Sequence, residues 1–324
     1  MAESGTDIQT AKALLEAGQL VAIPTETVYG LAANAFDEDA VLKIFEAKNR
    51  PQFDPLIVHT DSISKIINFV TELPAQAQRL AQAFWPGPLT LLLPKKRIIP
   101  DLVTSGLDTV AVRIPNHALT LKLLSELSFP LAAPSANPFG YISPTSAQHV
   151  ENQLGNKLKY ILDGGKCTVG IESTIVGFED DQAVVYRLGG ISVEAIEAVI
   201  GKVLVQPHST SNPKAPGMLK SHYSPRKPFF LMSDLGYKMY AKSNIIRHTS
   251  AAYLAFQYLS PMFPIENQRI LSPSGDFGEA AKNLFAYLRE LDELDIDKIY
   301  AELLPEENLG RAINDRIRRA AAVE

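Results

Sequence analysis

Two cationic side chains beside a proline are candidates for binding a ligand or stabilising charge in a reaction. Lys48 and Arg50 follow the last turn of a predicted helix, and Pro51 ends that helix. A lysine here can neutralise a phosphate as a point charge, and the planar guanidinium of an arginine can bind two oxygens at once. The alternative is that both side chains only complement the negative end of the helix dipole. The residues alone leave both interpretations open.

A third cation and a histidine lie in predicted strands. Arg113 alternates with the apolar residues of TVAVRIP, so it points away from the face that Val112 helps to form. An arginine in this position needs an anion or an exit to solvent, and a substrate carboxylate would suit its bidentate geometry. His59 ends the apolar segment PLIVH. It is either a ligand at the same edge or a histidine packed in the core.

Hydroxyl and amide side chains stand near other strand ends. In PTETVYG, Thr25 and Thr27 alternate with Glu26, so both hydroxyl groups are expected on one side. A turn whose hydroxyls bond the local backbone is the simpler alternative. If the turn is a site, Thr27 is expected to touch the ligand, with Thr25 and Glu26 bracing it from behind. Comparable polar groups follow along the chain: Ser135, Asn137, Ser143, Thr145, Glu172, Ser173 and Arg187.

Several other chemistries lack their motifs. The sequence has no GxxxxGKS/T phosphate loop, no GxGxxG dinucleotide motif and no GxSxG nucleophile motif. Its only cysteine, Cys167, lies in a glycine-rich loop without a helix start that would lower the thiol pKa, so we interpret it as incidental. One cysteine also excludes an internal disulfide and a cysteine-rich zinc site. P-loop NTPases, classical Rossmann enzymes and serine hydrolases are therefore disfavoured.

The elements that must position these groups alternate between strands and helices. Apolar segments predict strands over 20–24, 55–60, 89–94, 109–115, 130–135, 173–178 and 183–188. Helices are expected after Asp37, from Pro74, after Thr145 and after Ser192, where capping residues precede periodic apolar patterns. This alternation predicts an α/β domain around a sheet that is at least partly mixed. Open α/β sheets bind ligands at the carboxyl ends of their strands.

A proline-rich stretch divides the chain. Residues 1–203 form the first predicted domain, and residues 204–228 carry prolines and little periodicity, which predicts a linker. From 229 to 324, strands are expected at FFLM, NIIRHT and KIYAELL, and helices around EAAKNLFAYLRELDEL and GRAINDRIRRAAA. These segments predict a second, smaller α/β domain of Rossmann-like type.

Composition bounds the class of protein and its setting. The chain has 324 residues, of which 46% are hydrophobic and 21% charged, as is typical of a globular protein of roughly two domains. A net charge of -5 argues against nucleic-acid binding through overall charge, so any tRNA contact is expected to be local and weak. The single cysteine and the lack of an apolar leader or long apolar segment predict a cytoplasmic protein without membrane association.

Taken together and in order, the motifs resemble those of a known enzyme family. The series PTETVYGL, KNRP, PLIVH, WPGPLT, VAVRIP, PSAN, STIV and RLGG is similar to that of the YrdC-like L-threonylcarbamoyladenylate synthases over roughly residues 8 to 202. APGMLKSHYSP and the C-terminal α/β domain resemble the long, two-domain form. The resemblance implies a twisted mixed sheet with helices on its faces that forms a concave basic cavity. It also implies synthesis of L-threonylcarbamoyladenylate from L-threonine, bicarbonate and ATP, with release of pyrophosphate.

The resemblance also implies partners and residue roles. A separate threonylcarbamoyl transferase would move the product's threonylcarbamoyl group onto an adenosine of tRNA. One set of matching residues would surround L-threonine, with the arginine pairing its carboxylate: Thr27, His59, Arg113, Ser135 and Ser173. A second set would hold ATP, with the cations along its triphosphate: Lys48, Arg50, Asp54, Thr109, Asn137, Ser143, Thr145, Arg187, His222 and Tyr223.

By the same resemblance, catalysis needs no covalent protein nucleophile. The threonine amine adds to carbon dioxide or bicarbonate, and the resulting carbamate attacks the α-phosphate in line. Lys48 and Arg50 stabilise charge, Mg²⁺ is expected with ATP, and no metal ligand is assigned. Because carbamate and adenylate both react with water, KSHYSP is predicted to close over the cavity as a lid. Asp54 departs from the asparagine usual in the family, so it is either a metal contact or a local turn former.

Two other functions remain as alternatives. A hydrogenase-maturation-type module that makes carbamoyladenylate has a YrdC-like portion, but such proteins carry zinc-finger-like cysteines that this sequence lacks. A double-stranded RNA- or tRNA-binding module would use the concave surface. The acidic net charge and the lack of interleaved aromatic and basic residues argue against it as the main function.

Overall fold

The computed structural model describes residues 1–179, 182–206, 215–216, 218, 223–232 and 250–322, which form two compact units. The N-terminal unit comprises residues 1–139 and 143–220, and the C-terminal unit comprises residues 140–142 and 221–324. The short segment 140–142 therefore belongs to the C-terminal unit, although it lies between two parts of the N-terminal one. The change of unit after residue 220 falls inside the predicted linker.

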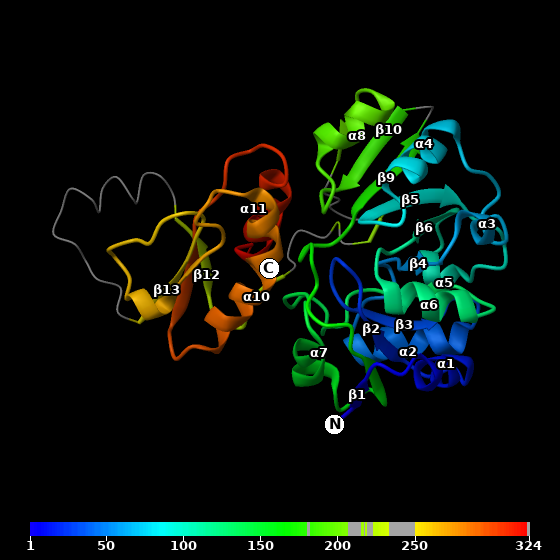
Figure 1. Ribbon diagram of the computed structural model, residues 1–324, viewed down its shortest axis with the longest axis horizontal. Helices are drawn as coiled ribbons and strands as arrows, with labels where there is room; N and C mark the ends of the chain where they lie inside the picture. Colours follow the sequence, from blue (N-terminus) through cyan, green and yellow to red (C-terminus); the bar gives the residue numbers. More distant parts are fainter. Residues whose placement is uncertain (180–181, 207–214, 217, 219–222, 233–249, 323–324) are drawn as a thin grey trace. The chain divides into compact units, whose positions relative to one another are not determined.

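A mixed sheet of 11 strands forms the centre of the N-terminal unit (Figure 1). In chain order the strands are β1 (Glu3–Gly5), β2 (Val21–Ile23), β3 (Gly30–Asn34), β4 (Ile57–His59), β5 (Leu89–Pro94), β6 (Thr109–Arg113), β7 (Leu131–Ala132), β8 (Tyr160–Leu162), β9 (Thr174–Glu179), β10 (Gln182–Arg187) and β11 (Leu204–Val205). In space their order is β1-β8-β2-β3-β7-β4-β6-β5-β9-β10-β11. β4 pairs with β6 in parallel, whereas β5 pairs with β6 in the antiparallel sense. The predicted α/β fold with a mixed sheet is therefore confirmed.

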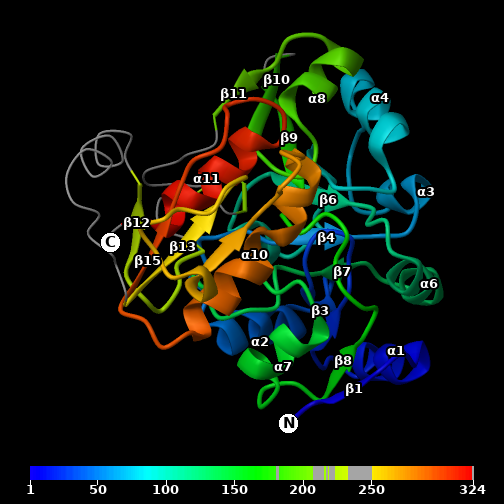
Figure 2. The same cartoon turned by 60° about the vertical axis from the view of Figure 1, so that its left-hand side comes forward.

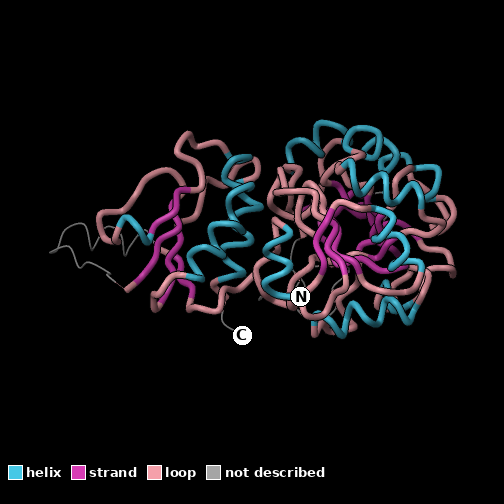
Figure 3. The backbone as a smooth tube through the Cα atoms, turned by 60° about the horizontal axis from the view of Figure 1, so that its bottom comes forward, coloured by secondary structure: helices cyan, strands magenta, loops and turns pink. Residues whose placement is uncertain are grey.

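Helices and loops surround this sheet (Figure 3). The helices are α1 (Ile8–Glu16), α2 (Glu38–Lys48), α3 (Ile63–Ile66), α4 (Ala75–Phe84), α5 (Asp101–Thr104), α6 (Ala118–Glu126), α7 (Ala147–Leu154) and α8 (Val193–Ile200). Asp37 and Ser192 cap α2 and α8 as predicted, because their side chains accept hydrogen bonds from the backbone N–H groups of Ala40 and Ala195.

The prediction that Thr145 caps the following helix is wrong. The N-cap of α7 is Ser146, whose extended backbone lets its Oγ accept a hydrogen bond from the backbone N–H of His149. Thr145 lies one residue outside the helix, and its N and Oγ1 are 3.2 and 3.3 Å from Nδ1 of His149. The sequence offers two adjacent hydroxyl residues here, and the chain enters the helix at the second.

The side chains of β6 pack on the two faces of the sheet in two different apolar clusters. Val110 and Val112 are fully buried in the main hydrophobic core. Ala111, which points to the other face, packs in a smaller apolar cluster with Ile57 and Ile175. Because strand side chains alternate, Arg113 lies on the face of Ala111, as predicted.

Four parallel strands form the sheet of the C-terminal unit. They are β12 (Phe229–Leu231), β13 (Ala251–Ala255), β14 (Gln268–Ile270) and β15 (Lys298–Ala301), in the spatial order β12-β15-β13-β14. α10 (Phe277–Glu293) and α11 (Gly310–Ala320) lie side by side on this sheet (Figure 2), and η1 (Ile265–Asn267) precedes β14. The second α/β domain is confirmed, while the strand predicted at NIIRHT lies outside the described residues. Among the described helices of the whole chain, none is long and apolar enough to cross a bilayer.

Candidate active site

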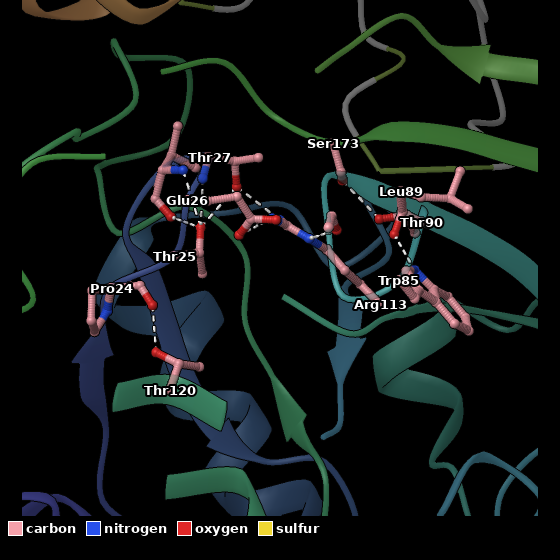
Figure 4. A network of polar contacts seen from close by, with 12 residues as sticks. Pro24, Thr25, Glu26, Thr27, Trp85, Leu89, Thr90, Arg113, Thr120 and Ser173 are labelled. Carbon is pink, nitrogen blue, oxygen red and sulfur yellow. Dashed lines mark hydrogen bonds and ion pairs between the residues drawn. The ribbon is translucent and has the colours of Figure 1, made fainter. Parts of the chain in front are cut away.

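The loop after β2 holds its two threonine hydroxyls together (Figure 4). Oγ1 of Thr25 and Oγ1 of Thr27 are 2.8 Å apart, so both hydroxyls face the same side as predicted. Thr25 also accepts hydrogen bonds from the backbone N–H groups of Thr27 and Val28 and donates to the Val28 carbonyl. Thr25 therefore stabilises the turn itself. Thr27 instead reaches a residue of another strand.

That residue is Arg113, at the end of β6. Its Nη1 donates to Oγ1 of Thr27 at 2.8 Å, and its Nε donates to the Gly87 carbonyl at 3.3 Å. Its Nη2 lies 2.8 Å from Oε2 of Glu26. Only 3% of Arg113 is exposed, so the alternative of an exit to solvent is wrong. From the sequence, Glu26 is expected only to brace the loop from behind. Instead its side chain forms an ion pair with this guanidinium.

His59 lies beside Arg113, because β4 and β6 pair in parallel with these two residues in register. Its ring is buried, and Nδ1 is 3.2 Å from the Ile57 carbonyl. Burial, followed by the charge of Arg113, lowers the pKa of His59 to about 3, so the ring is neutral at neutral pH. A carbonyl can only accept, so the neutral ring donates to Ile57 from Nδ1, and the ring also hydrogen-bonds the backbone of Leu131.

A second arginine meets the hydroxyls of two further strands. Arg187 ends β10 after a β-bulge, and bulges redirect side chains. Its Nε and Nη2 donate to the carbonyl and the Oγ of Ser173, both at 3.0 Å. Oγ of Ser173 is 2.7 Å from Oγ1 of Thr90 (Figure 4). The charge of Arg187 also lowers the pKa of His59, so Arg187 lies near this ring.

Lys48 joins two loops at the end of α2. Its buried ammonium group donates to the carbonyl of Ser135 at 2.6 Å and to the carbonyl of Asn137. Burial lowers the pKa of Lys48 well below its usual value, and the charge of Arg50 lowers it further. Lys48 therefore does more than complement the helix dipole, because it ties the KNR turn to the PSAN turn.

Arg50 and Asp54 form a buried pair. Nη2 of Arg50 lies 2.8 Å from Oδ2 of Asp54, and its Nε donates to the Asp54 carbonyl. The guanidinium also lies 5.9 Å from the ring centre of Phe139. Of the two interpretations of Asp54, the pair favours the local role. Within the described residues no group of three or more His, Cys, Asp or Glu side chains could hold a metal ion.

Further loops complete the surroundings of PTETVYG. Ser135 forms a bridge with Gly30, and the backbone N–H of Tyr29 donates to the Pro144 carbonyl at 2.9 Å. Ser143 donates to Oε1 of Glu172 at 2.6 Å. Asn137 and Thr145 lie in the connection between β7 and α7, which also contains Ser135 and Ser143. The structure thus brings most of the predicted residues to one connected set of loops and strand ends.

Three predicted residues lie apart from this set or outside it. Thr109 starts β6, four residues before Arg113, and lines a pocket of about 420 Å³ with Leu92 and Phe178. Tyr223 belongs to the C-terminal unit, where its buried ring stacks on Phe285 with centroids 5.4 Å apart. His222 lies outside the described residues, as do the first two residues of KSHYSP.

Thr90 has no predicted role, although a lone threonine in an apolar strand is a signal that could indicate one. A single threonine in the apolar strand LTLLLP is fully buried and bonds Ser173. Cys167 is buried, and burial raises the pKa of its thiol to about 12, which supports the interpretation of this cysteine as incidental. Chemically, the arrangement combines buried cations with hydroxyls and a neutral imidazole. Such a set can bind an anionic, hydroxylated ligand and position it without a covalent step.

Two families of known proteins match this chain. The Sua5, YciO and YrdC family described as "telomere recombination" matches residues 13–189. The C-terminal domain of threonylcarbamoyl-AMP synthase matches residues 191–322.

Individual relatives cover nearly the whole chain. The threonylcarbamoyl-AMP synthase of Pyrococcus abyssi is 40% identical over 97% of this chain and 94% of its own length. That of Bacillus subtilis is 39% identical over 97% of this chain and 92% of its own. A crystal structure of P. abyssi Sua5 complexed with L-threonine matches with a TM-score of 0.89 and 38% identity, covering 99% of this chain and 97% of that one. Escherichia coli YciO, at 21% identity and a TM-score of 0.52, covers 58% of this chain and 96% of its own, and shows the fold of the N-terminal unit alone.

Proposed function

The chain belongs to the threonylcarbamoyl-AMP synthase family, and on that premise we propose that its N-terminal unit condenses L-threonine, bicarbonate and ATP into threonylcarbamoyl-AMP and pyrophosphate. It is an ATP-dependent nucleotidyltransferase of that family. The observation that carries the proposal is that Arg113 and His59, in register at the ends of β6 and β4, meet Thr27 from the loop after β2. A buried guanidinium beside a hydroxyl and a neutral imidazole complements a small amino acid that carries a hydroxyl group.

L-Threonine would bind at this group. The Arg113 guanidinium pairs with the substrate carboxylate, since a planar fork suits two carboxylate oxygens. The neutral imidazole of His59 would contact the substrate hydroxyl. Hydroxyls of Thr27, Ser135 and Ser173 supply the remaining polar contacts.

ATP would lie along a second group of cations, Lys48, Arg50 and Arg187. An ammonium group has three donors, and Lys48 uses two of them on backbone carbonyls, so a third can reach a phosphate oxygen. Arg50 and Arg187 add charge for the triphosphate. Further ATP contacts would come from Asn137, Ser143 and Thr145, which lie in the connection between β7 and α7.

The reaction then follows from positioning and charge neutralisation. The threonine ammonium releases a proton to solvent, and the amine forms a C–N bond to the carbon of carbon dioxide, produced by dehydration of bicarbonate, as a C=O π bond opens. Loss of a second proton from the nitrogen gives the carbamate. A carbamate oxygen attacks the α-phosphorus of ATP, and pyrophosphate leaves from the opposite side. Lys48 and Arg50 stabilise the charge that develops on the phosphate oxygens. Mg²⁺ bound to ATP would neutralise further charge on the triphosphate.

Part of the predicted linker covers this face of the N-terminal unit. Ala215 and Met218 are buried in the apolar cluster that contains Ala111 and Ile175. Nη1 of Arg187 donates to the Pro216 carbonyl at 3.4 Å. These contacts support a linker that keeps water away from the carbamate and the adenylate.

The product would serve a separate threonylcarbamoyl transferase that acts on tRNA, and we place this step in the cytoplasm. Pyrophosphate release tests the proposal: it should require threonine, bicarbonate and ATP together. Release without threonine dependence, combined with tight and salt-sensitive binding of duplex RNA, would favour the RNA-binding alternative instead.

A further inference from the structure

Glu26 is a buried carboxylate that the mechanism above leaves without a role. Only 5% of the residue is exposed. Its Oε2 lies 2.8 Å from Nη2 of Arg113, but without hydrogen-bond geometry. Within the part of the chain that the structure describes, neither side-chain oxygen accepts a hydrogen bond. A carboxylate offers about four acceptor positions, so beyond the ion pair with Arg113 these oxygens leave buried acceptor positions that a further cationic donor could fill.

The loop that carries Glu26 is anchored, so the position of its carboxylate and of any bound donor is fixed. The backbone carbonyl of Glu26 accepts a hydrogen bond from the N–H of Val169 at 2.7 Å, which anchors the loop. Figure 4 shows the side chains of Glu26 and Thr27 both directed toward the guanidinium of Arg113. Glu26 thus stands next to the two residues proposed to bind the carboxylate and a polar atom of threonine.

The charges of the site match those of an amino acid. An α-amino acid carries an ammonium and a carboxylate on one carbon, so its binding site needs an anion and a cation side by side. His59 is neutral, so of the side chains that contact Arg113, Glu26 is the one that carries a negative charge. It is therefore placed to meet the ammonium group of a ligand whose carboxylate is bound by Arg113.

We propose that Glu26 binds the ammonium group of L-threonine while Arg113 binds its carboxylate, so that the site recognises the substrate as a zwitterion. This inference rests on the proposed function. The carboxylate holds the nitrogen at the point from which, after losing a proton, it forms the bond to the carbon of carbon dioxide. Glu26 is in this sense a substrate-binding residue that positions the nucleophile.

A purely structural role, in which Glu26 only orients Arg113, makes opposite predictions for two substrate fragments. Threoninol keeps the amine and lacks the carboxylate, whereas 3-hydroxybutyrate keeps the carboxylate and lacks the amine. We would measure the binding of both fragments and of threonine by ligand-observed NMR, with wild-type protein, Glu26→Gln and the control Glu126→Gln. Glu126 is a partly exposed residue of the same unit, whose carboxylate accepts a hydrogen bond from Gln9 at 2.8 Å and lies 4.0 Å from Nζ of Lys12.

Glu26→Gln should weaken threonine and threoninol binding roughly ten- to a hundredfold, the range of one charge-assisted hydrogen bond, and change 3-hydroxybutyrate binding less than about twofold. Glu126→Gln should change none of them. Weaker 3-hydroxybutyrate binding with unchanged threoninol binding would overturn the inference. So would equal losses for both fragments, or no loss for any ligand.

Glu26→Asp keeps the charge on a shorter side chain and guards against a variant that fails to fold. It should bind threonine more tightly than Glu26→Gln, and the reverse order would contradict the inference. The proposed function fails separately: wild-type protein that binds neither threonine nor either fragment would refute it.

Discussion

Acidification should destabilise the N-terminal unit through His59. Burial lowers the pKa of this imidazole to about 3, whereas an unfolded histidine titrates near 6.5. The unfolded chain therefore binds a proton that the folded chain does not, and stability is lost as pH falls from about 6.5 toward 3. Linkage gives a loss of about 2 kcal/mol between pH 7 and pH 5 from this residue alone.

The assay compares wild-type protein with His59→Gln, which cannot titrate in this range. Trp85 is the only tryptophan of the chain, and its Nε1 donates to the Leu89 carbonyl close to the site, so its fluorescence reports on the N-terminal unit. Urea unfolding at pH 7, 6 and 5 should show an additional loss of about 2 kcal/mol in the wild type at pH 5. Equal pH dependence in both proteins would refute the claim that a neutral, buried imidazole forms part of the site.

Three further predictions concern ligands, the linker and a helix end. Arg50→Ala should weaken ATP binding and Arg113→Ala threonine binding, each by about 2 kcal/mol or more in calorimetry; equal effects on both ligands in both variants would contradict the assignment. Deleting residues 207–227 should abolish synthesis or release more hydrolysed intermediate per pyrophosphate, and unchanged kinetics would exclude a protective linker. Ser146→Ala should lower the free energy of unfolding by about 1 kcal/mol because it removes the cap of α7, and a larger loss from Thr145→Ala in the same denaturation experiment would reverse the cap assignment.

The sequence predicts strands well where apolar residues alternate or cluster. β5 and β6 follow directly from LTLLLP and TVAVR, because sheet faces repeat every two residues. β3 was missed, since GLAAN consists of small residues with a glycine and an asparagine that usually indicate turns. Tertiary pairing with β2 and β7 decides its conformation.

For the site, the sequence predicts which residues take part better than what each one contacts. The face of Arg113 followed from alternation, and the nearness of Thr25 to Thr27 from spacing. The Glu26–Arg113 ion pair joins residues 87 positions apart, and the contacts of Lys48 with the PSAN carbonyls span a similar distance. Such contacts depend on strand order, which no local pattern encodes.

The central claim is that one site joins threonine, bicarbonate and ATP. The most direct measurement supplies ¹³C-labelled bicarbonate with threonine and ATP and identifies the AMP-linked product by mass spectrometry. The account predicts a product that contains one threonine, one labelled carbon and one AMP, formed together with pyrophosphate. An AMP-linked product without the label, or one formed equally well without threonine, would contradict it.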